Sequence, residues 1–435
     1  MAKLAFLAAG LLAAAATVPA PAPPAVPPPA PPPHVDNPYA GAIGYVNPQW
    51  SALARSEPGG ERVAANPTAV WLDSIASIDG ADGDMGLRDH LDAALAQRAG
   101  YIQFVINNLP GRDCNRLVSE GELGPTELVR YQAEYIDPIA DILADPRYRR
   151  LRIITIIEVR ALANLVVNTT PRPTATPACD TMLINGNYVA GVRYALNRLH
   201  AIPNVYTYLD VANHAWTGRD ENLGPIVQLL VSTVRGTTAG LASVDGFITN
   251  TADYAPLVEP FVDDPNGLSE WNDGNRYGSE LPFAQALRAR LILAGFPATI
   301  GMLIDTSRNG WGGPNRPTAP STHPDLDTAV DESRVDRRAH KNNWCNQIGA
   351  GLGERPRANP APGIDAYVWA KPPGESDGSA TPTSIRGFNP MCDPTYRGGI
   401  ANGFKPSTAA PGAPDTGEWF SAYFQSLLAN AYPPL

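Results

Sequence analysis

Short apolar runs rich in β-branched and aromatic residues alternate along the chain with longer segments of 3.6-residue periodicity. The runs predict strands over Ala69–Asp73, Tyr101–Asn107, Leu151–Glu158, Asn204–Asp210, Val244–Thr249, Ala298–Asp305 and Asp365–Lys371. The periodic segments predict helices over Leu87–Arg98, Thr126–Leu143, Tyr188–Leu199, Phe283–Ala294 and, at the end, Glu418–Ala431. Alternation of this length indicates an α/β fold with a mostly parallel sheet, and about seven repeats favour a (β/α) barrel.

A polar residue ends almost every predicted strand. These residues are Asp73, Asn107, Glu158, Asp210, Asp305 and Lys371. In a (β/α) barrel the active site forms at the carboxyl ends of the strands, so the set predicts a site there. For any single residue the competing explanation is a strand stop or a helix N-cap, because Asp and Asn serve readily in both places.

Two long segments, Asp305 to Trp344 and Lys371 to Pro414, are rich in turn residues. Loops longer than roughly 15 residues are usually functional lids or disordered linkers. The Trp, Arg and Cys content of these two segments favours ordered lids, which would form a tunnel or cleft at the mouth of the barrel.

The chain begins with the pattern of a secretory signal. Lys3 precedes an apolar run, Leu4–Val18, and small residues follow, so residues 1–20 are predicted to be a signal peptide. The run is shorter than the roughly 20 residues that span a bilayer, and a retained N-terminal anchor is the alternative. Residues 21–36 are a proline-rich tail expected to be disordered. Residues 37–435 contain no second low-complexity linker and are expected to form one secreted domain, which would be free of the membrane once the signal is cleaved.

Export places the four cysteines, Cys114, Cys179, Cys345 and Cys392, in an oxidising compartment. Two disulfides are therefore expected over free thiols, and four cysteines allow three pairings. The cysteines and the six His lie too far apart in the sequence for metal-ligand spacing. We expect neither a metal nor a cofactor.

The composition is that of a folded protein, with 44% hydrophobic and 17% charged residues. The formal net charge is −10, from 33 Lys and Arg against 43 Asp and Glu. A chain of this charge lacks the basic footprint of a protein that binds nucleic acid or an anionic membrane.

Tryptophans and carboxylates near the strand ends suit a carbohydrate. Trp71, Trp216 and Trp344 offer flat faces on which sugar rings stack, although a large core residue is the alternative for any Trp. Glycoside hydrolysis needs two carboxyl groups, one protonated and one ionised, on opposite sides of the scissile bond. Asp113 and Asp377 follow different strands, which is the placement that such a pair requires.

Several motifs in register resemble those of glycoside hydrolase family 6, the inverting cellulases. They are Leu109–Cys114, Leu162–Leu165, Tyr208–Asp210, Trp344–Asn346 and Tyr367–Gly378. The resemblance covers about residues 37–435. It implies a distorted barrel of seven or eight strands, a β-1,4-glucan substrate and a tunnel built by two long loops. It also implies the disulfides Cys114–Cys179 and Cys345–Cys392, the sequence-local pairing that we favour.

The resemblance also assigns roles to individual residues. Asp113 would hold and tune the general acid, Asp377 falls at the candidate base, and Ser119 would help to place the water. The substrate-binding set would be Trp71, Asp73, Asn107, Asp210, Trp216, Trp344, Lys371 and Glu375. Within it, Lys371, Glu375 and Trp71 serve the non-reducing side, Trp344 and Trp216 the leaving-group side, and Asp210 orients the network.

One position departs from the family pattern in a way that affects the chemistry. The family's general acid is an Asp in a Glu-x-Asp-Ser-Leu motif, whereas this chain has Glu158, Val159, Arg160, Ala161 and Leu162. A guanidinium stays protonated and is a very poor proton donor. If Arg160 faces Asp113, it lowers the pKa of that carboxyl. Glu158 is the nearest carboxyl that could substitute, but it lies one strand step deeper, about 7 Å along the strand.

Three functions are consistent with this sequence. The first is a secreted β-1,4-glucan (cellulose) hydrolase with much reduced activity because the general acid is missing. The second is a non-catalytic glucan-binding protein, and the third is a hydrolase of a different, acidic polysaccharide. The expected partner is a β-glucan polysaccharide or oligosaccharide, and the expected oligomeric state is a monomer.

Overall fold

The computed structural model describes residues 1, 34–81, 83–116, 119–382 and 388–435. The chain divides into two units, Met1–Pro31 and Pro32–Leu435, and all helices and strands below belong to the second. The predicted signal peptide, except for Met1, and the first thirteen residues of the predicted proline-rich tail lie outside the described residues.

A single eight-stranded sheet forms the centre of the fold, in the order β1-β2-β3-β4-β5-β6-β8-β7. The strands are β1 Val70–Leu72, β2 Tyr101–Ile106, β3 Arg152–Ile157, β4 Val205–Asp210, β5 Gly246–Thr249, β6 Gly301–Asp305, β7 Arg357–Ala361 and β8 Ile364–Val368. Every neighbouring pair is parallel except β7–β8. All seven predicted strands are confirmed. β7 was missed because its residues, Arg-Ala-Asn-Pro-Ala, form no apolar run.

The two ends of the curled sheet approach each other at β1 and the segment after β8. The backbone N–H of Ala69 donates to the carbonyl of Trp369 over 3.0 Å. The indole Nε1 of Trp71 donates to the carbonyl of Ala370 over 2.8 Å. The sheet is therefore a distorted, incompletely closed barrel, and the predicted fold class is confirmed.

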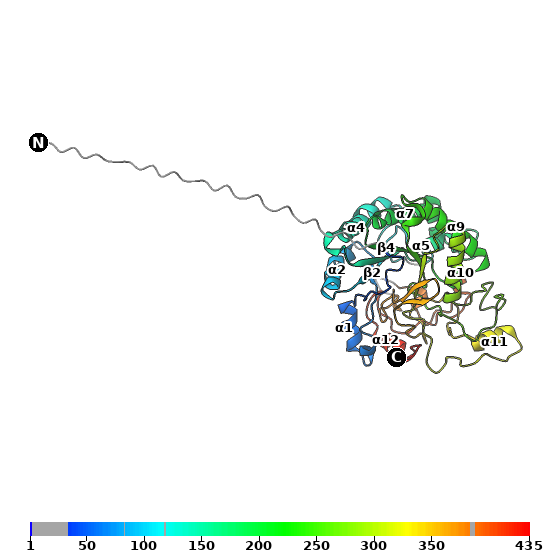
Figure 1. The fold of residues 1–435 in the computed structure, drawn as a ribbon. Helices are drawn as coiled ribbons and strands as arrows, with labels where there is room; N and C mark the ends of the chain where they lie inside the picture. The colour runs from blue at the N-terminus through cyan, green and yellow to red at the C-terminus, as the bar shows by residue number, and fades with distance from the viewer. Residues whose placement is uncertain (2–33, 82, 117–118, 383–387) are drawn as a thin grey trace. The chain divides into compact units, whose positions relative to one another are not determined.

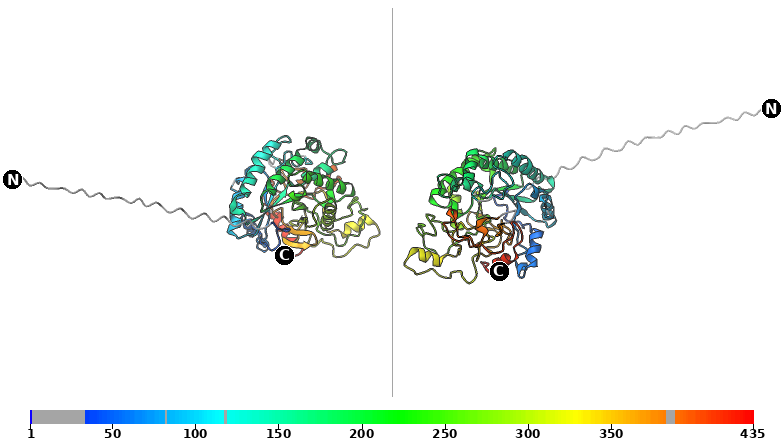
Figure 2. Two further views of the ribbon diagram at one scale, coloured as in Figure 1. Left: turned by 45° about the horizontal axis from the view of Figure 1, so that its top comes forward. Right: turned by 180° about the vertical axis from the view of Figure 1, so that it is seen from behind.

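Helices cover the outer side of the sheet, as Figure 1 shows for α4, α7, α9 and α10 around β2 and β4. The helices are α1 Pro48–Ser56, α2 Leu87–Ala96, α3 Leu128–Arg130, α4 Asp137–Leu143, α5 Ala161–Val167, α6 Pro177–Asn185, α7 Asn187–His200, α8 His214–Thr217, α9 Asp220–Arg235, α10 Glu280–Leu293, α11 Leu326–Ser333 and α12 Ser421–Ala429. The further views in Figure 2 show α11, in yellow, at the periphery.

One predicted helix differs from the structure, and one long helix was not predicted, each for a local reason. The segment predicted as one helix over Thr126–Leu143 consists of α3, a π-helical stretch at Tyr131–Ile136, and α4. Helix α9 was missed because Gly224 and Pro225 lie within it, and this dipeptide is usually a turn signal.

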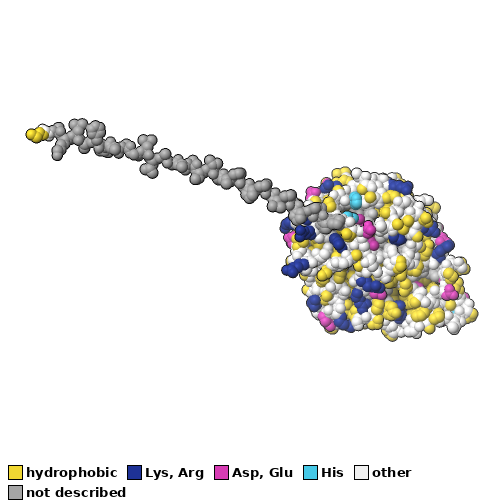
Figure 3. Space-filling view, viewed as in Figure 1, with side chains coloured by type: hydrophobic (Ala, Val, Ile, Leu, Met, Phe, Trp, Pro, Cys, Tyr) yellow, Lys and Arg dark blue, Asp and Glu magenta, His cyan; other side chains and the backbone are white. Residues whose placement is uncertain are grey.

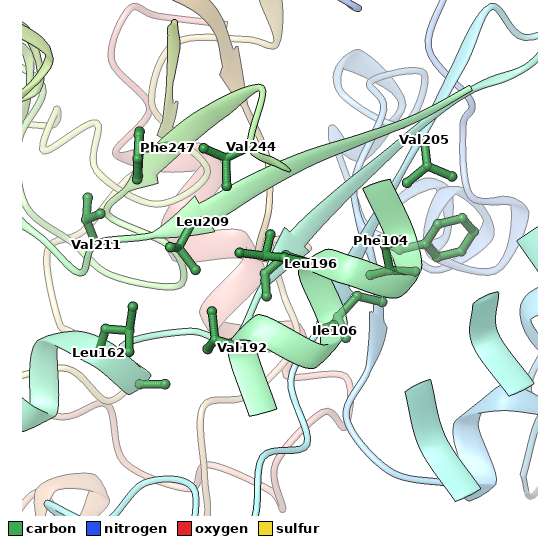
Figure 4. Packing of buried hydrophobic residues seen from close by; sticks show 14 of the residues in the cluster. Phe104, Ile106, Leu162, Val192, Leu196, Val205, Leu209, Val211, Val244 and Phe247 are labelled. Atoms are coloured by element: carbon green, nitrogen blue, oxygen red, sulfur yellow. The ribbon is translucent and has the colours of Figure 1, made fainter. Parts of the chain in front are cut away.

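The core lies on both faces of the sheet. Phe104 and Ile106 of β2 pack with Leu196 of α7 in the layer between sheet and helices, which Figure 4 shows from close by. Val105, between them in β2, belongs to a second cluster with Ile154 of β3, because successive side chains point to opposite faces. All six residues of β2 are therefore buried, as in a parallel sheet that is covered on both sides.

Two disulfides fasten the loops around the barrel mouth. Cys114, after β2, is bonded to Cys179 in α6. Cys345 is bonded to Cys392, which joins the two long loops. Both predicted pairings are confirmed. Among the described residues, no helix is both long enough and apolar enough to cross a bilayer.

Candidate active site

A cavity of about 650 Å³ opens at the carboxyl ends of the strands. Its walls come from α1, from β1 and from the segments that follow β1, β2, β3, β5, β6 and β8. The structure brings nine of the predicted site residues together there. They are Trp71, Asp73, Asn107, Asp113, Arg160, Trp344, Lys371, Glu375 and Asp377.

Three predicted site residues are not among the residues that line this cavity. Asp210 is buried beneath Arg160, whose backbone N–H donates to it over 2.7 Å. Ser119 donates its hydroxyl to the carbonyl of Arg112 over 2.6 Å. Trp216 lies half-buried in α8. Of the three, Asp210 is buried, Trp216 is half-buried and Ser119 is exposed to solvent.

Asp113 lies in a concentration of positive charge. The backbone of Asp113 is left-handed, with φ of 57°. Its Oδ1 lies 3.4 Å from Nε of Arg116. Burial disfavours ionisation, but Arg116, Arg112 and Arg160 together outweigh it and lower the pKa of Asp113. Asp113 is therefore ionised, and its direct partner is Arg116 rather than Arg160, the partner that the sequence suggested.

The side chain of Arg160 is bound by the segment after β5. Arg160 is the N-cap residue of α5, with a backbone φ of 59°. Nη2 donates to the carbonyls of Thr251 and Ala252, both over 3.2 Å, and lies 3.6 Å from Oδ2 of Asp253. The same Asp253 pairs with Arg338 over 3.1 Å. The guanidinium thus has several partners of its own in the wall of the cavity.

Glu158, the carboxyl nearest to Arg160 in sequence, is structural. It accepts hydrogen bonds from the backbone N–H groups of Asn108 and Leu109, over 3.2 and 3.1 Å, and from the hydroxyl of Tyr131 over 2.8 Å. Burial raises the pKa of Glu158 to about 7, against the effect of these hydrogen bonds. Glu158 is fully buried and does not line the cavity. It fixes the start of the loop after β2, in keeping with its expected depth.

Asp377 is a carboxylate of the cavity lining with several hydrogen-bond and ion-pair partners. Arg308 Nη1 lies 2.7 Å from its Oδ1, while the hydroxyl of Tyr254 and the backbone N–H of Asn346 donate to Oδ2 over 2.5 and 2.9 Å. Burial opposes ionisation, but Arg308 and then Lys371 outweigh it, so the pKa of Asp377 is lowered. Arg308 was not among the predicted site residues. Its position just beyond the carboxyl end of β6 is the sequence feature that could have identified it.

Trp71 has a polar neighbourhood suited to sugar hydroxyls. Nζ of Lys371 lies 5.5 Å from the centre of the Trp71 ring and 3.2 Å from Oε2 of Glu375. Burial raises the pKa of Glu375, although Lys371 acts against this. An aromatic face beside an ammonium and a carboxyl group offers both stacking and hydrogen bonds to one sugar ring.

Trp344 has a cation on its face. The guanidinium of Arg116 lies 4.0 Å from the centre of the Trp344 ring, and its Nη1 lies 3.5 Å from Oε1 of Glu120. The sequence analysis missed Arg116, Glu120 and Trp419, all of which line the cavity. Arg116 and Glu120 belong to the loop that carries Asp113. Trp419 lies just before α12 and does not follow a predicted strand, so the strand-end pattern did not indicate it.

The cavity is more acidic than basic. Its acidic lining residues are Asp73, Asp84, Asp113, Glu120, Glu375, Asp377 and Glu418, and its basic ones are Arg112, Arg116, Arg160 and Lys371. On the face shown in Figure 3, charged side chains of both signs are scattered among uncharged ones. In the described part of the chain, no cluster of three or more His, Cys, Asp and Glu side chains is placed to hold a metal ion.

Comparison with known proteins gives consistent matches. The family model described as glycosyl hydrolases family 6 matches residues 32–431. Exoglucanase A of Cellulomonas fimi is 45% identical over 92% of this chain and 49% of its own length, so the chain spans about half of that relative. The 1,4-beta-D-glucan cellobiohydrolase C of Emericella nidulans is 31% identical over 91% of this chain and 79% of its own length.

Solved structures match over nearly the whole described fold. The catalytic domain of Cellulomonas fimi Cel6B has a TM-score of 0.89 and 43% identity, covering 93% of this chain and 97% of that one. The CcCel6A catalytic domain, complexed with p-nitrophenyl beta-D-cellotrioside, has a TM-score of 0.71 and 29% identity, covering 92% and 99%.

Proposed function

Because the chain belongs to glycosyl hydrolase family 6, we propose that it is a secreted β-1,4-glucan hydrolase of the inverting type, with activity lowered by the loss of the usual general acid. Relatives named exoglucanase and cellobiohydrolase, and a solved relative that binds a cellotrioside, support the substrate class. The observation that carries the proposal is the cavity that holds Asp113, Asp377, Trp71 and Trp344 together.

The carboxylates divide the chemistry between them. Inversion requires a water molecule to attack the anomeric carbon while the leaving oxygen receives a proton. Arg308, Tyr254 and Asn346 keep Asp377 ionised. A carboxylate with a lowered pKa is a weak proton acceptor, so its larger contribution is to stabilise positive charge at the anomeric carbon. Asp113 is ionised as well and does not supply the proton.

Arg160 accounts for the lowered rate. It occupies the position at which the family motif has its acidic Asp, and an arginine does not release its proton at working pH. Loss of general acid catalysis costs roughly 10²–10⁴-fold in rate. We propose activity on cello-oligosaccharides at least about 10²-fold below that of a family member with an intact motif.

The charge of the cavity favours a neutral sugar chain over an acidic one. Carboxylates outnumber basic side chains in the lining. The guanidinium of Arg160 is already paired, through Nη2, with Asp253 and two carbonyls, and the carboxylates around it disfavour an anionic substituent. A uronic acid or sulfated polymer would therefore meet net repulsion.

The proposal extends to the organisation of the chain. Residues 1–20 would be a cleaved signal peptide, residues 21–36 a proline-rich tail, and residues 37–435 a monomeric catalytic domain. Two disulfides on the described body are typical of an extracellular protein.

The test is hydrolysis of cellohexaose by the purified protein, with the anomeric configuration of the fresh product followed by NMR. We expect slow release of α-anomers, at least about 10²-fold below the catalytic domain of Cellulomonas fimi Cel6B. Tight binding of cellohexaose with no product would make the protein a non-catalytic glucan-binding protein. Faster hydrolysis of an acidic polymer, or no binding of cellohexaose, would contradict the proposal.

A further inference from the structure

If the usual acid is absent, any protonated carboxyl that reaches the sugar must come from another part of the cavity. Glu158 is excluded, since it is buried behind the lining with hydrogen bonds to both oxygens. Asp113 and Asp377 are excluded because neighbouring arginines hold them as anions. Of the remaining lining carboxyls, Asp84 and Glu418 are exposed to solvent. Asp73 and Glu375 follow the strands beside Trp71, on the side opposite the expected leaving group.

Glu120 satisfies the geometric requirements that the others fail. It lines the cavity, and its side chain is 14% exposed. It lies on the side of Trp344, because Arg116 contacts Glu120 Oε1 at 3.5 Å and stacks on the Trp344 ring at 4.0 Å. Trp344 is the proposed platform for the leaving group. A general acid must reach the leaving oxygen from that side.

The residue is held in place at both its backbone and its side chain. Nη2 of Arg112 donates to the carbonyl of Glu120 over 2.9 Å. The hydroxyl of Thr416, from the loop after β8, donates to Oε1 over 3.0 Å. Both this bond and the Arg116 contact are made to Oε1. Among the described residues, none donates a hydrogen bond to Oε2, which leaves that oxygen for a ligand of the cavity.

The electrostatic environment separates Glu120 from its neighbour Asp113. Burial raises the pKa of Glu120, and the negative charge of Asp113 adds to this, against the opposing effects of Arg116, Thr416 and Arg112. The pKa of Asp113 is lowered by the same arginines. Two adjacent carboxyls whose pKa values are moved apart are the usual basis of an acid and a charge-stabilising partner.

We infer that Glu120 is the proton donor of this site. The inference rests on the proposed function. Oε2 gives its proton to the glycosidic oxygen as the bond from that oxygen to the anomeric carbon breaks, and the bonding electrons stay with the oxygen. Water attacks the anomeric carbon from the opposite face and releases a proton to solvent. Arg116 stabilises the Glu120 anion until solvent returns a proton.

The test compares substrates that differ in their need for an acid. Cellohexaose has an alcohol leaving group that must be protonated, whereas 2,4-dinitrophenyl β-cellotrioside has a leaving group that departs as the anion. In Glu120→Gln we expect kcat on cellohexaose to fall by about 10²-fold or more, and kcat on the dinitrophenyl glycoside to fall less than about threefold. Glu120→Asp, which keeps an acid, should recover part of the lost cellohexaose rate.

Glu122→Gln is the matched control. Glu122 accepts hydrogen bonds from Asn108 Nδ2 and the backbone N–H of Ile75 and does not line the cavity. Any loss in this variant should be equal for the two substrates. Unfolding midpoints of both variants show whether the loop stays folded.

The outcomes separate this inference from the proposed function. Equal losses on both substrates in Glu120→Gln, or an unchanged cellohexaose rate, would overturn the role of Glu120 and leave the hydrolase intact. Wild-type protein that cleaves only the dinitrophenyl glycoside would do the same, because no acid would be at work. Wild-type protein that cleaves neither substrate would overturn the proposed function itself.

Discussion

Nη2 of Arg160 lies 3.6 Å from Oδ2 of Asp253, and the carbonyls of Thr251 and Ala252 each accept a hydrogen bond from the same nitrogen. The side chain of Arg160, which follows β3, is therefore bound by the segment after β5. Asp253 also binds Arg338 over 3.1 Å. Asp253 thus binds two cations, the buried Arg338 and the partly exposed Arg160. Arg160 therefore contributes to the structure of the cavity wall.

Asp253→Asn should destabilise the fold. Arg338 is fully buried and keeps Asp336 as a partner at 2.7 Å, but Arg160 loses its carboxylate. Breaking a buried ion pair by removing one partner typically costs about 3–5 kcal/mol. We expect a loss of about 3 kcal/mol in the free energy of unfolding, measured by urea denaturation. The control is Glu134→Gln, whose exposed pair with Arg130 should contribute far less. Equal effects of the two changes would contradict this account.

Arg308→Met should affect both stability and activity. The guanidinium is fully buried, lies 2.7 Å from Asp377 and 4.3 Å from the centre of the Tyr254 ring, and donates to the carbonyl of Ala252. Without it the carboxylate is buried with only two hydrogen-bond donors, so its pKa rises and it is protonated at higher pH. We expect a loss of about 3–5 kcal/mol in unfolding free energy, and an acid limb of the rate–pH profile that moves to higher pH. An acid limb at the wild-type pH would remove Arg308 from the ionisation of Asp377.

Trp344→Ala should weaken glucan binding more than Trp216→Ala. Trp344 lines the cavity, whereas Trp216 does not. Loss of one stacking face is worth about 0.5–1.5 kcal/mol beyond the buried area, or up to about tenfold in Kd. Isothermal titration with cellohexaose measures both variants. A larger effect at Trp216 than at Trp344 would place the leaving-group platform in a different part of the surface.

His90 should make stability depend on pH. It is buried in α2, its Nδ1 lies 2.9 Å from the hydroxyl of Tyr45, and burial lowers its pKa to about 4. An unfolded chain binds a proton at this residue below about pH 6.5, and the folded chain does so only near pH 4. Its contribution is therefore present above pH 6.5 and is lost as the pH falls toward 4.

The comparison of wild type with His90→Gln isolates this contribution. Between pH 7 and 4.5 the wild type should lose about 2 kcal/mol more unfolding free energy than the variant. His214 and His340 are also buried with lowered pKa values, but both proteins retain them, so their effect cancels in the difference. Parallel stability curves for the two proteins would show that His90 titrates normally when folded.

The sequence was sufficient for the sheet because buried parallel strands are continuous apolar runs that end in polar residues. It was insufficient for β7, an edge strand with a proline, and for α9, which contains Gly224 and Pro225. Arg308 and Glu120 were missed for another reason. Their importance depends on which carboxylate or loop lies opposite, and no local pattern records a contact between residues 308 and 377 or between 120 and 416.

Substitution of Arg160 tests the proposed function most directly. In Arg160→Asp the left-handed N-cap position of α5 is kept, while a carboxyl replaces the cation beside Asp113 and Asp253. The negative charge of these neighbours would raise the pKa of the new carboxyl, as a general acid requires. Arg160→Asn is the matched control, since it removes the same cation but supplies no proton.

The decisive measurement is kcat/KM on cellohexaose for wild type, Arg160→Asp and Arg160→Asn, beside the catalytic domain of Cellulomonas fimi Cel6B. We expect the wild type to be slower than that domain by about 10²-fold or more, and Arg160→Asp to recover at least tenfold while Arg160→Asn recovers nothing. A wild type as fast as its relative, or equal rates in the two variants, would contradict the claim that this arginine limits the reaction.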